Sequence, residues 1–112
     1  MTLTESEYDH LAHAELLSLR DAIDALDTEE VEAELESGIL TLEFEDDSRY
    51  VINSHQAARQ IWMAADRSGW HFDWHPETKS WVSTKSSDEL WSVLQATLTK
   101  KLATQITLRR PG

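Results

Sequence analysis

Residues 30–44, EVEAELESGILTLEF, hold the strongest structural signal in this chain. Up to Leu35 every second residue is apolar and every residue between is glutamate, and after Ser37-Gly38 an alternation resumes and runs to Phe44. A period of two is typical of a strand with one buried and one exposed face, and Ser-Gly between two such runs is a turn signal. The stretch therefore predicts an antiparallel hairpin whose first strand has a carboxylate at every outward position.

Further short strands are expected on both sides of similar turn signals. Asp46-Asp47-Ser48 is predicted to turn the chain into a third strand, and Ser68-Gly69 to separate the fourth strand from the fifth. Pro76 ends the fifth strand because proline lacks the N–H that a ladder needs. The expected segments are residues 49–53, 60–65 and 70–75, and a short strand around Trp81.

Helices are predicted at the two ends of this meander. Apolar residues recur at spacings of three and four from Glu5 to about Leu26, which is typical of an amphipathic helix. A second helix is expected after Ser86-Ser87-Asp88-Glu89, interpreted as a capping box, and its apolar spacing continues to Leu102. The tail, residues 104–110, is expected either to lie back along the core or to fray.

This element order predicts an α+β fold built as a two-layer sandwich. The N- and C-terminal helices would pack side by side on one face of a five- to six-stranded antiparallel sheet, with the other face open to water. Residues 1–112 match the usual size of one domain. The chain has no cysteine, so any metal ligands must be oxygen or imidazole.

The charge of the chain is concentrated in one quarter of its length. Residues 21–48 hold twelve of the 21 acidic residues and no Lys, Arg or His, and the formal net charge is -11. Crowded like charges raise the energy of the compact state, so a cation is the expected partner, either a metal ion or a basic protein face. Nucleic acid is disfavoured, because phosphates are bound by clustered Lys and Arg. The polar, acidic N-terminus and the lack of a long apolar run favour a soluble, cytoplasmic protein with no membrane partner.

Several of these segments together resemble bacterial frataxin, the CyaY family. The matching segments, in order, are GILTLEF at 38–44, YVIN at 50–53, QIWMAA at 60–65 and GWHF at 69–72, and the likeness extends from about Ser6 to Leu108. The resemblance implies an iron-binding protein of iron–sulfur cluster assembly. It implies an iron donor or regulator whose partners are a cysteine desulfurase and an iron–sulfur scaffold protein.

The resemblance also implies the site residues. The metal-binding set, which we call the acidic ridge, is Asp21, Asp24, Asp27, Glu29, Glu30, Glu32 and Glu34. Helix and strand spacing leaves neighbouring carboxylates several ångströms apart, so we expect weak, overlapping sites for Fe(II) or Fe(III) rather than a rigid cage. Partner contacts are expected at Trp62, which lies in the outward phase of its strand, and at Glu43, Glu45, Asn53 and Gln60.

Other interpretations stay open. His10 and His13 could share a metal with Asp9 or Asp21, although surface histidines often have no ligand role. Enzyme signatures are weak: no glycine-rich phosphate loop and no placed nucleophile and base are found. A weak ferroxidase or iron-storage protein, and an acidic protein-binding module without metal, are the alternatives. A monomer is expected, with iron-dependent oligomers left open.

Overall fold

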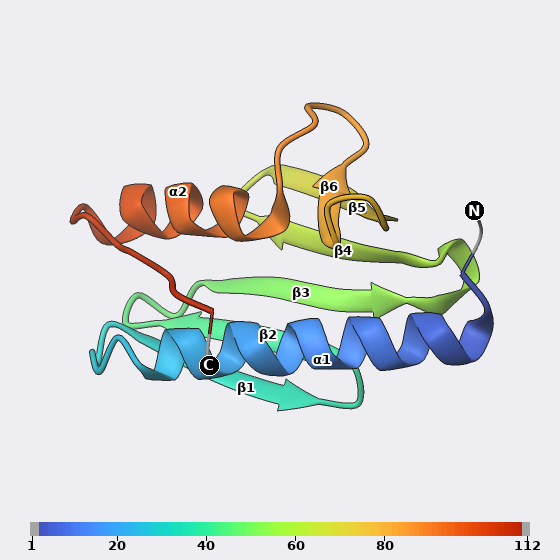
Figure 1. Cartoon of the computed structure of the whole chain (residues 1–112). Coiled ribbons are helices and arrows are strands. Elements are labelled where there is room, and N and C mark those ends of the chain that lie inside the picture. The colour runs from blue at the N-terminus through green and yellow to red at the C-terminus, as the bar shows by residue number, and fades with distance from the viewer. Residues whose placement is uncertain (1–2, 111–112) are drawn as a thin grey trace.

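Two helices lie side by side on one face of a six-stranded antiparallel sheet (Figure 1). The computed structural model describes residues 3–110. Strand order across the sheet follows the chain, so each strand pairs with its sequence neighbour, and the predicted sandwich is confirmed. The elements are α1 (Glu5–Asp24), β1 (Val31–Glu36), β2 (Ile39–Phe44), β3 (Arg49–His55), the 3-10 helix η1 (Gln56–Ala58), β4 (Gln60–Ala65), β5 (Ser68–His75), β6 (Ser80–Ser83) and α2 (Leu90–Leu102).

Helix α1 begins with a reciprocal cap. The Thr4 hydroxyl accepts the Glu7 backbone N–H, and the Glu7 carboxylate accepts the Thr4 backbone N–H in return. These two bonds satisfy donors that the first turn would leave free. The bond that the Thr4 backbone N–H donates to the Glu7 carboxylate holds the pKa of Glu7 below its usual value. The predicted apolar stripe is buried against the sheet, with Tyr8, Leu16 and Leu19 almost fully enclosed.

Helix α2 does not use the predicted capping box at Ser86. Its N-cap is Glu89, whose carboxylate accepts the Trp91 backbone N–H at 2.9 Å. Ser87 has φ 63 and so interrupts the turn that a cap at Ser86 would need. Lys100 and Lys101 lie in the last turn, where positive charge complements the helix dipole.

The turn between the fourth and fifth strands lies earlier in the chain than the sequence predicts. It is formed by Asp66 and Arg67, and Asp66 has φ 53, a left-handed conformation that Asp tolerates better than most residues. Ser68 and Gly69 instead belong to β5 and pair with Ala65 and Ala64. The remaining strands lie where the sequence predicts them, except that β3 extends to His55.

The core lies between the helices and the inner face of the sheet. Leu40, Leu42 and Phe44 point into it, as the alternation predicts, and Trp81 and Trp91 are buried there as well. The outward-phase residues leave the other sheet face without a covering layer in residues 3–110 (Figure 1). No helix in residues 3–110 has the length and apolar character needed to cross a membrane.

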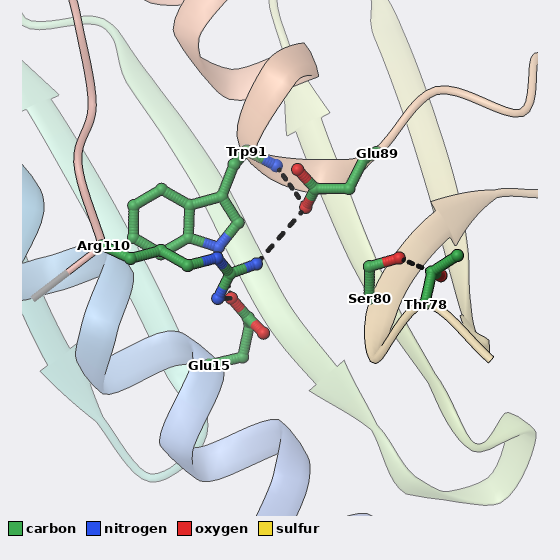
Figure 2. A network of polar contacts seen from close by, with 6 residues as sticks. All are labelled: Glu15, Thr78, Ser80, Glu89, Trp91 and Arg110. Carbon is green, nitrogen blue, oxygen red and sulfur yellow. Dashed lines mark hydrogen bonds and ion pairs between the residues drawn. The ribbon is translucent and has the colours of Figure 1, made fainter. Parts of the chain in front are cut away.

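The tail lies back along the core. Ile106 and Leu108 are buried, and the tail crosses from the end of α2 towards α1 (Figure 1). Arg110 then pairs with Glu15 of α1 at 2.8 Å and with Glu89 at 3.6 Å, and its guanidinium lies 4.6 Å from the Trp91 ring centroid. Glu15 also accepts the Trp91 indole N–H, and Figure 2 shows these side chains together. The tail therefore connects α1 to the start of α2.

Candidate metal and partner site

The helical part of the acidic ridge lies at the C-terminal end of α1. Asp21 and Asp24 are exposed there because the buried stripe of Leu19, Ala22 and Ile23 occupies the other side of the helix. Negative charge at this end of a helix meets the negative end of the dipole, which is an unfavourable placement. The two carboxylates gain nothing from the helix, so a cation would relieve them.

The remainder of the ridge follows the chain around the edge of the sheet. Asp27 has φ 51 in the connection that follows α1, and Glu29 and Glu30 precede β1. Glu32 and Glu34 are exposed on β1, the outermost strand, with side chains on the open face because Val31 points into the core. All seven ridge carboxylates are exposed, and they follow one another along the chain from the end of α1 to β1.

Little positive charge within the described chain offsets the acidic ridge. Arg20 pairs with Asp21 at 2.9 Å, but both side chains are exposed, and such pairs are worth little. Across the sheet, Glu32 stands directly opposite Glu43, and Glu43 in turn stands opposite Arg49. The Glu43 carboxylate lies 3.8 Å from the Arg49 guanidinium. Like charges opposite each other destabilise a sheet, and Arg49 contacts Glu43 but forms no ion pair with Glu32.

The ridge carboxylates do not converge into a ready-made metal cage. No group of three or more His, Asp or Glu side chains in residues 3–110 is arranged to hold a metal ion. Exposed carboxylates on flexible stems can still gather around a hydrated hard cation, which takes oxygen ligands. The donor chemistry therefore suits iron or another hard cation, bound by side chains that move to meet it.

The open face has one prominent aromatic feature. The Trp62 ring is half-buried between two imidazoles: its centroid lies 3.8 Å from that of His55 and 4.2 Å from that of His71, with nearly parallel planes. Its indole N–H donates to Gln60 Oε1 at 2.8 Å, and the Gln60 amide donates to Asp73 at 2.9 Å. Trp62 is thus held on the surface at a fixed angle rather than buried in the core.

The other predicted partner residues are distributed around this stack. Asn53 stands directly opposite Trp62, in a row that crosses five strands from Glu36 through Ile39 to His71. Ile39 is the exposed large apolar side chain of the described residues, at 47% exposure. Glu43 lies further along β2, and Glu45 lies beyond the end of that strand. Gln60 and Asn53 therefore join Trp62 in one patch, whereas Glu43 and Glu45 lie nearer the ridge.

Residues 3–110 contain no metal cluster at the predicted histidine pair. His10 and His13 are exposed on α1, and Asp9 accepts instead from the Gln56 amide at 3.3 Å. Sequence reasoning missed His55 and Asp73 as members of the Trp62 patch. His55 is in the same outward phase as Asn53, so a longer third strand would have predicted its place.

Comparison with known proteins places these features in a family. Residues 1–104 match the family model described as Frataxin-like domain. A curated relative, the iron-sulfur cluster assembly protein CyaY of Pseudomonas fluorescens, is 33% identical over 95 residues, which cover 85% of this chain and 86% of that protein.

Solved structures agree with this match. Frataxin from Psychromonas ingrahamii superposes with a TM-score of 0.87 at 26% identity, covering 96% of this chain and 100% of the other. Trimeric frataxin from the yeast Saccharomyces cerevisiae, solved in complex with ferrous iron, has a TM-score of 0.72 at 26% identity and covers 93% of this chain and 90% of that chain. The six-stranded sheet with its two helices is therefore the architecture of these proteins.

Proposed function

Because this chain belongs to the frataxin (CyaY) family, we propose that it is a non-enzymatic protein of iron–sulfur cluster assembly that binds iron weakly along its acidic ridge. One observation carries the proposal: seven exposed carboxylates border one edge of the molecule, and within residues 3–110 a single ion pair, Arg20 to Asp21, offsets them. Iron is the cargo here, and its oxygen ligands would come from two or three carboxylates at a time.

The same ridge would dock on a basic face of the cysteine desulfurase. Electrostatic steering favours such a contact, and it predicts that affinity falls as salt screens the charges. The iron–sulfur scaffold protein would contact Trp62, together with Asn53 and Gln60. A rigid, half-exposed indole is a common anchor of protein interfaces, which supports this assignment.

An amide NMR titration tests both uses of the ridge. The ¹⁵N-labelled protein is titrated with Fe(II) without oxygen and then, in a separate sample, with the cysteine desulfurase. We expect the amides of residues 21–34 to broaden or shift in both titrations. The double variant Asp24→Asn, Glu32→Gln removes two ridge charges and should weaken both responses. Glu77→Gln, at an exposed acid on the connection between β5 and β6, is the matched control.

The outcomes separate the proposal from its alternatives. If the ridge amide signals do not change at millimolar Fe(II), the ridge does not bind metal. The alternative of an acidic protein-binding module would then remain. Sustained oxygen consumption on Fe(II) addition would instead identify a ferroxidase. Desulfurase binding that resists the double ridge variant would move the docking surface elsewhere.

A further inference from the structure

The outer edge of β5 is paired over only half its length. Strand β6 pairs with residues 72–75, so residues 68–71 have β4 on one side and no strand of residues 3–110 on the other. The Thr84 backbone N–H donates to the His71 carbonyl at 2.9 Å, which places that carbonyl on the outer edge. Since backbone groups alternate in direction along a strand, the N–H and C=O of Gly69 point outward as well.

This free edge lacks the features that usually prevent strands from pairing. The opposite edge of the sheet, β1, carries Glu32, Glu34 and Glu36, and charged side chains deter another chain from adding there. Residues 68–71 include no proline and no Asp, Glu, Lys or Arg, and Ser68, Gly69 and His71 are exposed. The β5 edge is therefore open to a backbone partner.

Packing within the chain does not explain why residue 69 is glycine. A Cβ built on Gly69 would meet only the Met63 carbonyl oxygen, at an ordinary 3.7 Å, and the φ of Gly69 is not positive. A glycine inside a strand often marks a place where another backbone approaches closely. At Gly69 that approach would come from outside the described fold.

Two hollows beside the edge would receive side chains of an added strand. They lie on either side of Trp70, with volumes of about 320 Å³ and 260 Å³, and α2 forms their far wall with Ala96 and Thr97. Trp70 is in the helix-facing phase of β5, like Phe72. Alternate residues of a strand paired to residues 68–71 would therefore point towards α2 and into these hollows.

Charge selects the kind of side chain that fits. Asp88 is the one charged residue lining the larger hollow, and Trp70 lines it too. Among residues 3–110 the Asp88 carboxylate has no ion-pair partner. An aromatic ring beside a carboxylate suits Lys or Arg. A second copy of this chain is disfavoured, because its own net charge of -11 would be repelled.

We propose that the β5 edge at residues 68–71 binds an extended segment of a partner protein by strand addition, with a Lys or Arg of that segment against Trp70 and Asp88. Main-chain hydrogen bonds at Gly69 supply the pairing, since the His71 carbonyl already accepts the Thr84 N–H. The hollows beside α2 select the alternating side chains. This surface is separate from the acidic ridge, and the proposal does not depend on iron binding.

The test uses a peptide whose edge hydrogen bonds can be removed. The probe is acetyl-Val-Thr-Lys-Thr-Val-Thr-amide, and its control has the same sequence with alternate amides N-methylated. Amide NMR of the ¹⁵N-labelled protein at physiological salt should show shifts at residues 68–71 and 92–100. N-methylation should raise the Kd about tenfold, because it removes backbone donors while keeping the charge.

A pair of variants checks the side-chain hollows. Ala96 is exposed on α2 and lines both hollows, so Ala96→Leu should narrow them and weaken peptide binding by a similar factor. Ala14→Leu, at an exposed alanine on α1, is the matched control and should change nothing.

Three results would overturn the proposal. Shifts confined to the ridge, residues 21–34, would indicate charge attraction alone. Equal binding of the N-methylated peptide would exclude strand addition. A dimer in sedimentation experiments, with concentration-dependent shifts at residues 68–71 in the absence of peptide, would make a second copy the occupant. Because the variants lie outside the ridge and the titrations contain no iron, none of these results bears on iron binding.

Discussion

Trp62 is the clearest case of a single residue whose surroundings suggest its role. Its ring contacts two imidazoles and its N–H reaches Gln60, yet it belongs to the open face rather than to the core. Loss of the ring should therefore remove a contact surface while sparing the fold.

We predict that Trp62→Ala weakens binding of the scaffold protein and lowers the free energy of unfolding by only about 1–2 kcal/mol, the worth of two aromatic contacts. Calorimetric titration and urea unfolding measure the two effects. Trp81→Ala is the contrasting variant, because Trp81 is fully buried and its loss should cost about 3–5 kcal/mol. Equal destabilisation by the two variants would contradict the assignment of Trp62 to the surface.

Asp46 supplies a second prediction at this scale. Its carboxylate accepts from Lys101 at 2.7 Å and from Ser48, and these hydrogen bonds hold the pKa of Asp46 well below its usual value. The pKa of Asp46 is therefore lower in the folded state than in the unfolded state, where it is near 3.8. The stability that its hydrogen bonds contribute is complete above the unfolded-state value and is lost as the pH falls through the folded-state value.

Accordingly, Asp46→Asn should be less stable than the parent at neutral pH, and the difference should shrink as the pH drops below about 4. Urea unfolding at a series of pH values measures it. The control is Asp47→Asn, in the same turn, since Asp47 makes no ion pair within residues 3–110. If the difference in free energy of unfolding between Asp46→Asn and the parent stayed the same at the lowest pH values, the Asp46 carboxylate would not be its source.

At the scale of elements, the tail connects the two helices through one buried carboxylate. Glu15 is 7% exposed and is satisfied by Trp91 and Arg110, while burial raises the pKa of the neighbouring Glu89 (Figure 2). A buried carboxylate that loses its cation is costly.

Arg110→Ala should therefore lower the free energy of unfolding by about 2 kcal/mol. Arg109→Ala, at an exposed neighbour without an ion pair in the described residues, should have almost no effect. A double-mutant cycle with Glu15→Gln isolates the pair. Additive effects in that cycle would mean that the tail stabilises by apolar contact alone, through Ile106 and Leu108.

For the whole molecule, the ridge predicts how stability responds to cations. Repulsion among exposed carboxylates destabilises the compact state, so added salt should raise the melting temperature. Fe(II) should raise the melting temperature further, because a ligand at 100 times its Kd adds ~2.7 kcal/mol to the free energy of unfolding. Differential scanning calorimetry without oxygen measures both responses, and the Asp24→Asn, Glu32→Gln double variant should reduce them. A ridge variant that responds to iron as the parent does would place the bound iron elsewhere.

We also predict that residues 1–112 form a single domain. The core is shared by both helices and all six strands, so one cooperative transition is expected, with equal calorimetric and van't Hoff enthalpies. Two resolved transitions would contradict it.

Local periodicity predicts most of the fold. A strand such as residues 60–65 is predicted to the residue because alternating burial follows the order of its side chains, and α1 is predicted because its stripe recurs every three to four positions. Turns and caps are less well predicted. Asp66 adopts a left-handed conformation that the nearby Ser68-Gly69 is better suited to supply, and Glu89 rather than Ser86 caps α2.

The order of the elements along the chain predicts the sandwich, and spacing within single segments predicts the exposed carboxylates and the outward phase of Trp62. Tertiary contacts were needed to learn that His55 and His71 enclose Trp62, that Arg110 reaches Glu15, and that β6 ends before it covers the outer edge of β5 at Gly69. Those contacts join residues distant along the chain, and they depend on strand register and the path of the connections, which no local pattern encodes.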